Sequence, residues 1–200
     1  FIPGCMAWAI TVSLSPPTPP PLPIGAIGTY TASAADAGSG QVWYRFRVRP
    51  ASGEFRLVRD FAPSATFNWT TLDPEGIQEI EVTARTSTSA TSASTIVRQE
   101  FTSLLKDGAA SVTSTANPLV WIFSAPPCPQ GAIVYAEYTG AGRPPQVSSP
   151  RHCNGQTSAN VYLAGMIKDH DYSVHAIVQM DGVNTPGETL SFHTGAVDED

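Results

Sequence analysis

The sequence predicts an all-β protein made of two tandem β-sandwiches. Charged residues make up 14% of its 200 residues, while Ser, Thr, Ala, Gly and Pro are abundant, and this composition favours many short strands over helices. Short runs of alternating apolar and polar residues recur about every ten residues, with turn sequences between them, as sandwiches require. Because 200 residues exceed the usual span of one sandwich, we expect two small domains with modest cores.

Residues 1–23 are expected to form a strand followed by a stiff proline-rich arm. The run PPTPPPLP at 16–23 should be extended polyproline II, roughly 25 Å long, which forbids continued sheet pairing. It is either an ordinary crossover between two sheets of one sandwich or an arm that delivers the strand before it into a neighbouring molecule. In the second case the subunit contact consists of the alternating apolar residues of that strand: Trp8, Ile10, Val12 and Leu14.

Residues 24–103 are expected to form an immunoglobulin-like sandwich. Turn sequences with Pro and Gly, such as Asp73-Pro74-Glu75-Gly76, separate strand-like runs because Pro fixes φ and Gly allows a positive φ. The low-complexity stretch 86–95 is interpreted as a flexible hairpin. This domain contains six strand-like runs, and the strand before the proline arm brings the total to seven. The six runs are 26–36, 42–50, 55–62, 65–72, 78–86 and 95–103.

One predicted strand of this domain has two chemically distinct faces. Tyr44, Phe46 and Val48 alternate with polar residues and are expected in the core. The opposite face could bind an anion or a glycan, with Trp43 as a stacking ring, or it could be a solvated surface whose arginines pair with Glu79 and Glu81 on a neighbouring strand. The residues of this face are Trp43, Arg45, Arg47 and Arg49.

Residues 104–200 are expected to form the second sandwich, ending in an acidic tail. Leu163 and Met166 precede a short polar turn, and Tyr172 then opens a strand in which Val174, Ala176 and Val178 fall on one face. This pattern resembles the second half of a fibronectin type III domain. The resemblance implies that the Tyr172 hydroxyl holds the turn in place, and that the module binds or spaces other groups rather than catalysing a reaction.

A second resemblance covers most of the chain. The segments 116–129, 160–166 and 192–195, together with Tyr44-Arg45-Phe46 and the stretches 58–61 and 67–69, are similar to the tandem β-sandwich region that precedes the propeller in bacterial arylsulfotransferase-like proteins. The sulfate-transferring residues of that family belong to the propeller, and the sequence stops at Asp200, so no catalytic residue is carried over. We therefore expect either a fragment of such an enzyme or a free-standing protein with another use for the paired sandwiches.

The three cysteines point to a location outside the cytoplasm. Cys128 and Cys153 flank a loop, and a disulfide between them would stabilise the fold by about 3 kcal/mol; two free buried thiols are the alternative. Ile2-Pro3-Gly4-Cys5 resembles the end of a bacterial lipoprotein signal, which would make Cys5 a lipidation site. We expect a secreted or cell-surface bacterial protein, and no stretch is long and apolar enough to cross a membrane.

The sequence offers little that predicts chemistry. With a net charge of −6 it lacks the basic surface that nucleic acids require. Asp169-His170-Asp171 and the His152-Cys153 pair invite a metal interpretation, but polar residues are expected in a turn and Cys153 is expected in a disulfide, so we predict no metal site. We likewise predict no catalytic residue and no cofactor.

Three functions remain open. The first is an extracellular structural protein that forms homo-oligomers or fibres when the N-terminal strand completes a neighbour's sheet. The second is an accessory region that spaces or docks the propeller of an arylsulfotransferase-like enzyme. The third is a glycan-binding or adhesive module that uses Trp43 and the arginine face.

Overall fold

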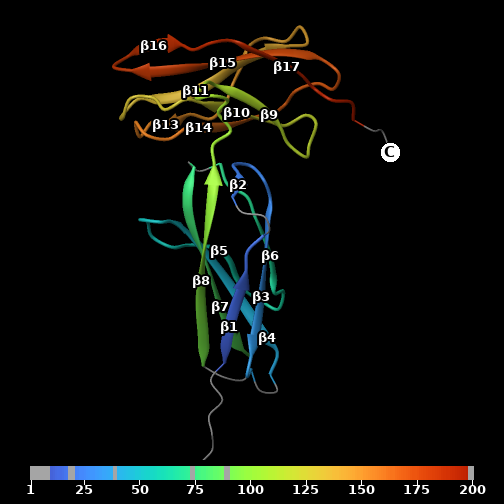
Figure 1. Cartoon of the computed structure of the whole chain (residues 1–200). Coiled ribbons are helices and arrows are strands. Elements are labelled where there is room, and N and C mark those ends of the chain that lie inside the picture. Colours follow the sequence, from blue (N-terminus) through green and yellow to red (C-terminus); the bar gives the residue numbers. More distant parts are fainter. Residues whose placement is uncertain (1–9, 18–20, 38–39, 73–74, 88–90, 198–200) are drawn as a thin grey trace, which may run out of the picture. The chain divides into compact units, whose positions relative to one another are not determined.

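The computed structural model describes residues 10–17, 21–37, 40–72, 75–87 and 91–197 (Figure 1). Within these ranges the regular structure consists of β-strands, with no helix, so the predicted all-β fold is confirmed. Trp8 and Cys5 lie outside the described residues. No helix in the described ranges is long and apolar enough to span a membrane.

The chain divides into two compact units. The first comprises Phe1–Leu22, Ala26–Thr70 and Gly76–Thr102. The second comprises Pro23–Gly25, Thr71–Glu75 and Ser103–Asp200. The longest segment of the second unit thus begins at Ser103.

The first unit is a sandwich of a three-stranded and a five-stranded sheet. The smaller sheet has the order β1-β3-β6 and the larger has the order β2-β8-β7-β4-β5. The central β4 and β7 pair along their whole overlap, from Val42 opposite Thr86 to Pro50 opposite Gln78. The strands are β1 (Thr11–Ser15), β2 (Leu22–Pro23), β3 (Gly28–Ala35), β4 (Val42–Pro50), β5 (Arg56–Ala62), β6 (Thr66–Trp69), β7 (Gly76–Thr86) and β8 (Ser92–Thr102).

The N-terminal strand lies in the sheet of its own chain. β1 pairs antiparallel with β3 from Thr11 opposite Ala35 to Ser15 opposite Thr31. Ile10 and Leu14 are buried in the core of this unit, and Val12 packs against it. Within one chain these three residues thus pack on their own sandwich, and their expected contact with a second subunit stays a prediction.

The proline-rich run connects the two sheets of this sandwich. β1 belongs to the smaller sheet, and β2 pairs with β8 in the larger one. This is the crossover alternative of the sequence analysis. The expectation that the whole run avoids sheet pairing is wrong at its end, because Leu22 retains the backbone N–H that the prolines lack.

The core of the first unit follows the predicted alternation. Tyr44, Phe46 and Val48 are all buried, and Phe46 stacks on Phe67 of β6 with ring centroids 4.8 Å apart. β7 and β8 form the hairpin that was expected at 86–95, with Ser92 of β8 opposite Arg85 of β7, and residues 88–90 of that stretch lie outside the described residues. Pairing across the hairpin extends these two strands, although Ser and Thr alone did not predict it.

The second unit is also a sandwich of two sheets. One has the order β14-β10-β9, and the other is built on the pair β11–β15, with β12 and β13 along β11 and with β16 and β17 along β15. The strands are β9 (Ser111–Ser114), β10 (Trp121–Ala125), β11 (Ile133–Gly140), β12 (Gln146–Val147), β13 (Arg151–His152), β14 (Ala159–Leu163), β15 (Asp171–Met180), β16 (Val183–Pro186) and β17 (Leu190–His193).

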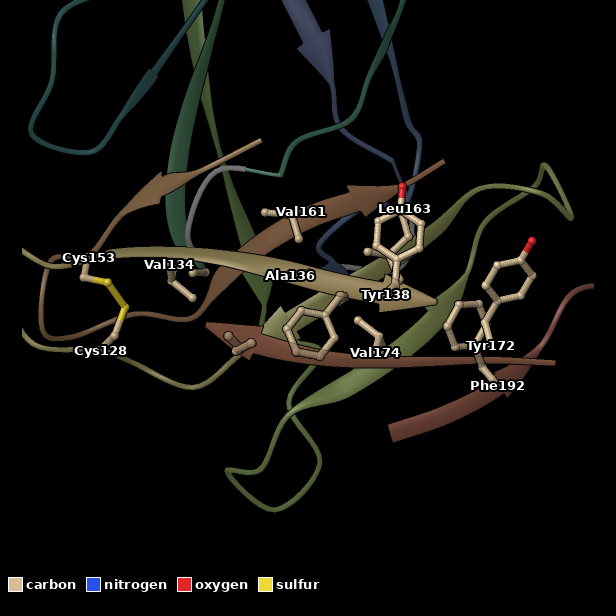
Figure 2. Packing of buried hydrophobic residues seen from close by; sticks show 14 of the residues in the cluster. Cys128, Val134, Ala136, Tyr138, Cys153, Val161, Leu163, Tyr172, Val174 and Phe192 are labelled. Carbon is tan, nitrogen blue, oxygen red and sulfur yellow. A yellow bond between two sulfur atoms is a disulfide. The ribbon is translucent and has the colours of Figure 1, made fainter. Parts of the chain in front are cut away.

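The turn before β15 has the geometry that the fibronectin type III resemblance implies. Leu163 and Met166 are buried, and the Tyr172 hydroxyl accepts a hydrogen bond of 2.9 Å from the backbone N–H of Ile167. Gly140 lies opposite Tyr172 on β11, and a Cβ at this position would collide with the Tyr172 ring and the Asp171 carbonyl. Glycine is therefore required where the ring crosses the strand. Figure 2 shows Tyr172 and Phe192 beside each other in this core.

Candidate functional site

The polar face predicted on β4 is the outer face of the five-stranded sheet, and we call it the outer face. Trp43, Arg45, Arg47 and Arg49 lie on it from β4, and β7 contributes the residues directly opposite them, Arg85, Thr83, Glu81 and Glu79. Successive side chains of a strand point to opposite sides, so the same alternation that buries Phe46 brings these polar residues together.

Two of the four predicted ligand residues are neutralised within the chain. Arg47 forms a bidentate pair with Glu81 through two hydrogen bonds of 2.8 Å, and Arg49 donates a hydrogen bond of 2.8 Å to Glu79. Arg98 of β8 lies 3.7 Å from the same Glu79 carboxylate. At Arg47 and Arg49 the solvated-face alternative of the sequence analysis therefore applies, because each guanidinium already has a carboxylate partner.

Aromatic rings of β5 and the residue before it cover the arginines. Arg47 and Arg49 lie 5.1 Å and 4.1 Å from the centre of the Phe55 ring. Arg45 and Arg85 lie 4.9 Å and 3.9 Å from the centre of the Phe61 ring. Cation–π contacts of this kind stabilise partly exposed sites by about 0.5–1 kcal/mol each.

The end of the outer face at Trp43 is different from the rest. A pocket of about 370 Å³ is lined there by Trp43, Arg85, Thr86 and Ser87. Within the ranges that the structure describes, the indole Nε1 of Trp43 and the Nε of Arg45 are buried and have no hydrogen-bond partner. The Thr86 hydroxyl likewise has none, but Thr86 lies opposite Val42 on the core-facing side of the sheet. Arg85 was not among the predicted site residues, although it lies directly opposite Trp43.

Arg59 is a second arginine whose role the sequence did not reveal. Its guanidinium lies 4.4 Å from the centre of the buried Phe46 ring and donates hydrogen bonds to the carbonyls of Ser64 and Thr66. Burial lowers the pKa of the Arg59 guanidinium below its usual value. The register shift between β4 and β5 at Phe46 accompanies this inward orientation, because a bulge re-aims a side chain.

A histidine lies between two carboxylates in the second unit. His193 of β17 is 2.8 Å from Asp171 through Nδ1 and 3.1 Å from Asp169 through Nε2. Hydrogen bonding to Asp171, and then to Asp169, raises the pKa of His193 above its usual 6.5, because both carboxylates favour the imidazolium. A broad hollow of about 620 Å³ lies beside it, lined in part by Thr139, Tyr172 and Ser191.

This cluster differs from the one that the sequence suggested. The turn Asp169-His170-Asp171 places His170 between the carboxylates in sequence, but the His170 imidazole lies 2.7 Å from the Lys168 carbonyl instead. β17 brings His193 there because it pairs with Asp171. Among the described residues no group of three His, Cys, Asp or Glu side chains is arranged to hold a metal ion.

The second unit contains the disulfide between Cys128 and Cys153, whose Cα atoms are 5.4 Å apart (Figure 2). Both residues are buried and join the core cluster. His152, the neighbour of Cys153, is exposed on β13 at the rim of a pocket of about 250 Å³. His175 lies 3.8 Å from Glu137 on the neighbouring strand.

No protein-family model matches this chain. No curated protein sequence matches it either. Among solved structures, it is similar to the FN1–FN3 domains of chicken CNTN1, with 13% identity, a TM-score of 0.36 and coverage of 92% of this chain and 66% of that chain. It is also similar to a segment of two fibronectin type III domains from chicken tenascin, with 15% identity, a TM-score of 0.35 and coverage of 93% and 98%.

Proposed function

We propose that this chain is a secreted, non-catalytic β-sandwich module with a structural or adhesive role. The observation that carries the proposal is the Cys128–Cys153 disulfide in a small all-β unit. Disulfides form and persist in extracellular and periplasmic spaces and are rare in the reducing cytosol. Small secreted sandwiches use such cross-links to supplement a modest core.

In the finer form of this proposal, chains assemble into fibres by exchanging β1. This strand lies at the edge of its sheet, it is short, and it contributes the core residues Ile10 and Leu14. Exchange keeps every contact between β1 and β3 but makes it between two chains, and head-to-tail repetition gives an open fibre.

A cross-link within the chain tests this form. Val12 and Ala34 lie directly opposite each other on β1 and β3, so a Val12→Cys/Ala34→Cys variant can lock β1 in its own sheet. We expect filaments by electron microscopy from the parent protein and from a Val12→Ser/Ala34→Ser control, and none from the locked variant. Filaments from the locked variant, or their absence from the parent protein, would contradict strand exchange.

A role as a spacing region of an arylsulfotransferase-like enzyme is a second candidate. It is supported by where the residues of that resemblance lie, because Tyr44, Phe46, Phe67 and Phe192 are all buried packing residues. Such residues build a scaffold and transfer no sulfate group. We expect no turnover when the purified protein is incubated with a nitrophenyl sulfate ester and a phenol, and turnover that survives repurification would contradict a non-catalytic role.

A further inference from the structure

The outer face of the first unit contains the same arrangement twice. In each copy two guanidinium groups lie over one phenylalanine ring: Arg47 and Arg49 over Phe55, and Arg45 and Arg85 over Phe61. The two arrangements differ in their counter-charges.

The copy at Phe55 is electrically balanced. Arg47 lies opposite Glu81 and Arg49 opposite Glu79, and the side chains of each pair approach to 2.7 Å. The copy at Phe61 is not balanced, because the residue opposite Arg45 is Thr83 and the residue opposite Arg85 is Trp43. No carboxylate of the described residues forms an ion pair with Arg45 or Arg85. Two cations that share one ring repel each other unless an anion lies between or beside them.

The surroundings of the unbalanced copy are rich in hydrogen-bond donors. Among the described residues, the Trp43 indole N–H and the Arg45 Nε–H, on the same face of β4, are buried and have no partner. A buried donor without an acceptor costs about 1–3 kcal/mol, so native proteins rarely place two of them on one face of a strand without a reason. The pocket of about 370 Å³ next to Trp43 and Arg85 falls within the size range of small-ligand sites.

We propose that this end of the outer face binds an acidic sugar through its carboxylate or sulfate group. Guanidinium groups match the oxygens of both groups with paired hydrogen bonds. Trp43 offers an aromatic surface and an indole donor, while the exposed Ser87 offers a hydroxyl group to the sugar. The inference goes beyond the structural role proposed above and does not depend on fibre formation.

The binding test uses the full chain and three matched sugars: glucuronic acid, glucose 6-sulfate and uncharged glucose. The readout is the ¹H–¹⁵N signal of the Trp43 indole, assigned with a Trp43→Phe variant. We expect saturable shifts with the two charged sugars, weaker binding at high salt because the contact is ionic, and no shift with glucose. Equal binding of glucose, or no saturation up to about 50 mM of either charged sugar, would overturn the proposal.

Substitution of Thr83 provides a second test of the proposal. Thr83→Glu places opposite Arg45 the carboxylate that Glu81 provides opposite Arg47, so we expect roughly tenfold or greater loss of affinity with the fold retained. In the control Thr83→Gln, the glutamine has the size of glutamate but no charge, so this variant should bind the charged sugars like the parent protein. Loss of affinity in Thr83→Gln equal to that in Thr83→Glu would overturn the role of the missing counter-charge.

Two further controls separate this site from the rest of the outer face. Arg85→Gln should abolish the shifts, whereas Arg49→Gln at the balanced end should leave them unchanged. Equal loss in both variants would overturn the assignment to this end of the sheet. Inorganic sulfate that binds as tightly as glucose 6-sulfate would overturn the assignment to a sugar.

Discussion

The hydroxyl of Tyr172 lies 2.9 Å from the backbone nitrogen of Ile167, across the turn that leads into β15. The ring of Tyr172 is buried against Phe192, so the side chain joins the core of the second unit to a backbone group of the turn. A turn that is held in this way places Asp169 and Asp171 in reach of His193.

Tyr172→Phe keeps the ring and removes the acceptor. The Ile167 N–H then lies part-buried without a partner, which should lower the free energy of unfolding by about 1–3 kcal/mol. Chemical denaturation measures this change. Tyr162→Phe is the matched control because Tyr162 is 43% exposed, and its stability should equal that of the parent protein. An unchanged midpoint for Tyr172→Phe would show that the hydrogen bond does not stabilise the turn.

A change of pH should alter the local stability of β17, the last strand of the second unit. The folded-state pKa of His193 is raised by Asp171 and Asp169, so the stabilising contribution of the imidazolium is complete below the unfolded value of 6.5 and is lost as the pH rises through the folded pKa. The amide protection factors of β17, which correct hydrogen exchange for its intrinsic pH dependence, should therefore be higher at pH 5.5 than at pH 8.

His193→Gln is the control for this pH effect, since it keeps a side-chain hydrogen-bonding group and cannot be charged. Its protection factors in β17 should not change over the same interval. An NMR titration of His193 that gives a pKa at or below 6.5 would contradict the proposed pairing with the two aspartates.

Leu14→Ala tests whether β1 belongs to the core of its own unit. Leu14 is 8% exposed. Removing three side-chain carbons from a buried site usually lowers the free energy of unfolding by about 2–5 kcal/mol, and we expect a loss in this range. Thr11→Ala on the exposed side of the same strand should change stability by less than about 0.5 kcal/mol. Equal stability of the two variants would mean that β1 does not pack as the structure has it.

Arg59→Lys tests the arginine that packs over Phe46. Lysine keeps the charge and loses the planar fork that reaches the carbonyls of Ser64 and Thr66, so a loss of about 1–3 kcal/mol in unfolding free energy is expected. Arg98→Lys, whose side chain is 63% exposed, should be neutral. If both substitutions proved neutral, the buried contacts of Arg59 would be energetically unimportant.

The fold was predictable from sequence because its signals are local. Period-two alternation in β4 identified the buried Tyr44, Phe46 and Val48, and the resemblance of Leu163, Met166 and Tyr172 to the fibronectin type III pattern identified the turn before β15. The sheet pairing at the end of the proline-rich run was not predictable, because Leu22 pairs with β8, a strand about 80 residues away in sequence.

The polar clusters were less predictable because they depend on pairing between strands. Arg85 reaches Trp43 only through the register of β4 with β7, and His193 reaches Asp171 only through the register of β15 with β17. The predicted pairing of the β4 arginines with Glu79 and Glu81 was a usable signal, because the same antiparallel register places Arg85 opposite Trp43. The neighbours of His193 could not be inferred, because His170 stands between the same aspartates in sequence.

Thermal unfolding of the protein with its disulfide intact and after reduction tests most directly whether the Cys128–Cys153 cross-link stabilises the second sandwich. Cys128 and Cys153 are 25 residues apart, and the entropy of closing such a loop corresponds to about 3 kcal/mol. The account predicts that reduction lowers the melting temperature of the second unit by roughly 10–20 °C. Identical melting with and without reductant, with both thiols free to alkylation before reduction, would contradict it.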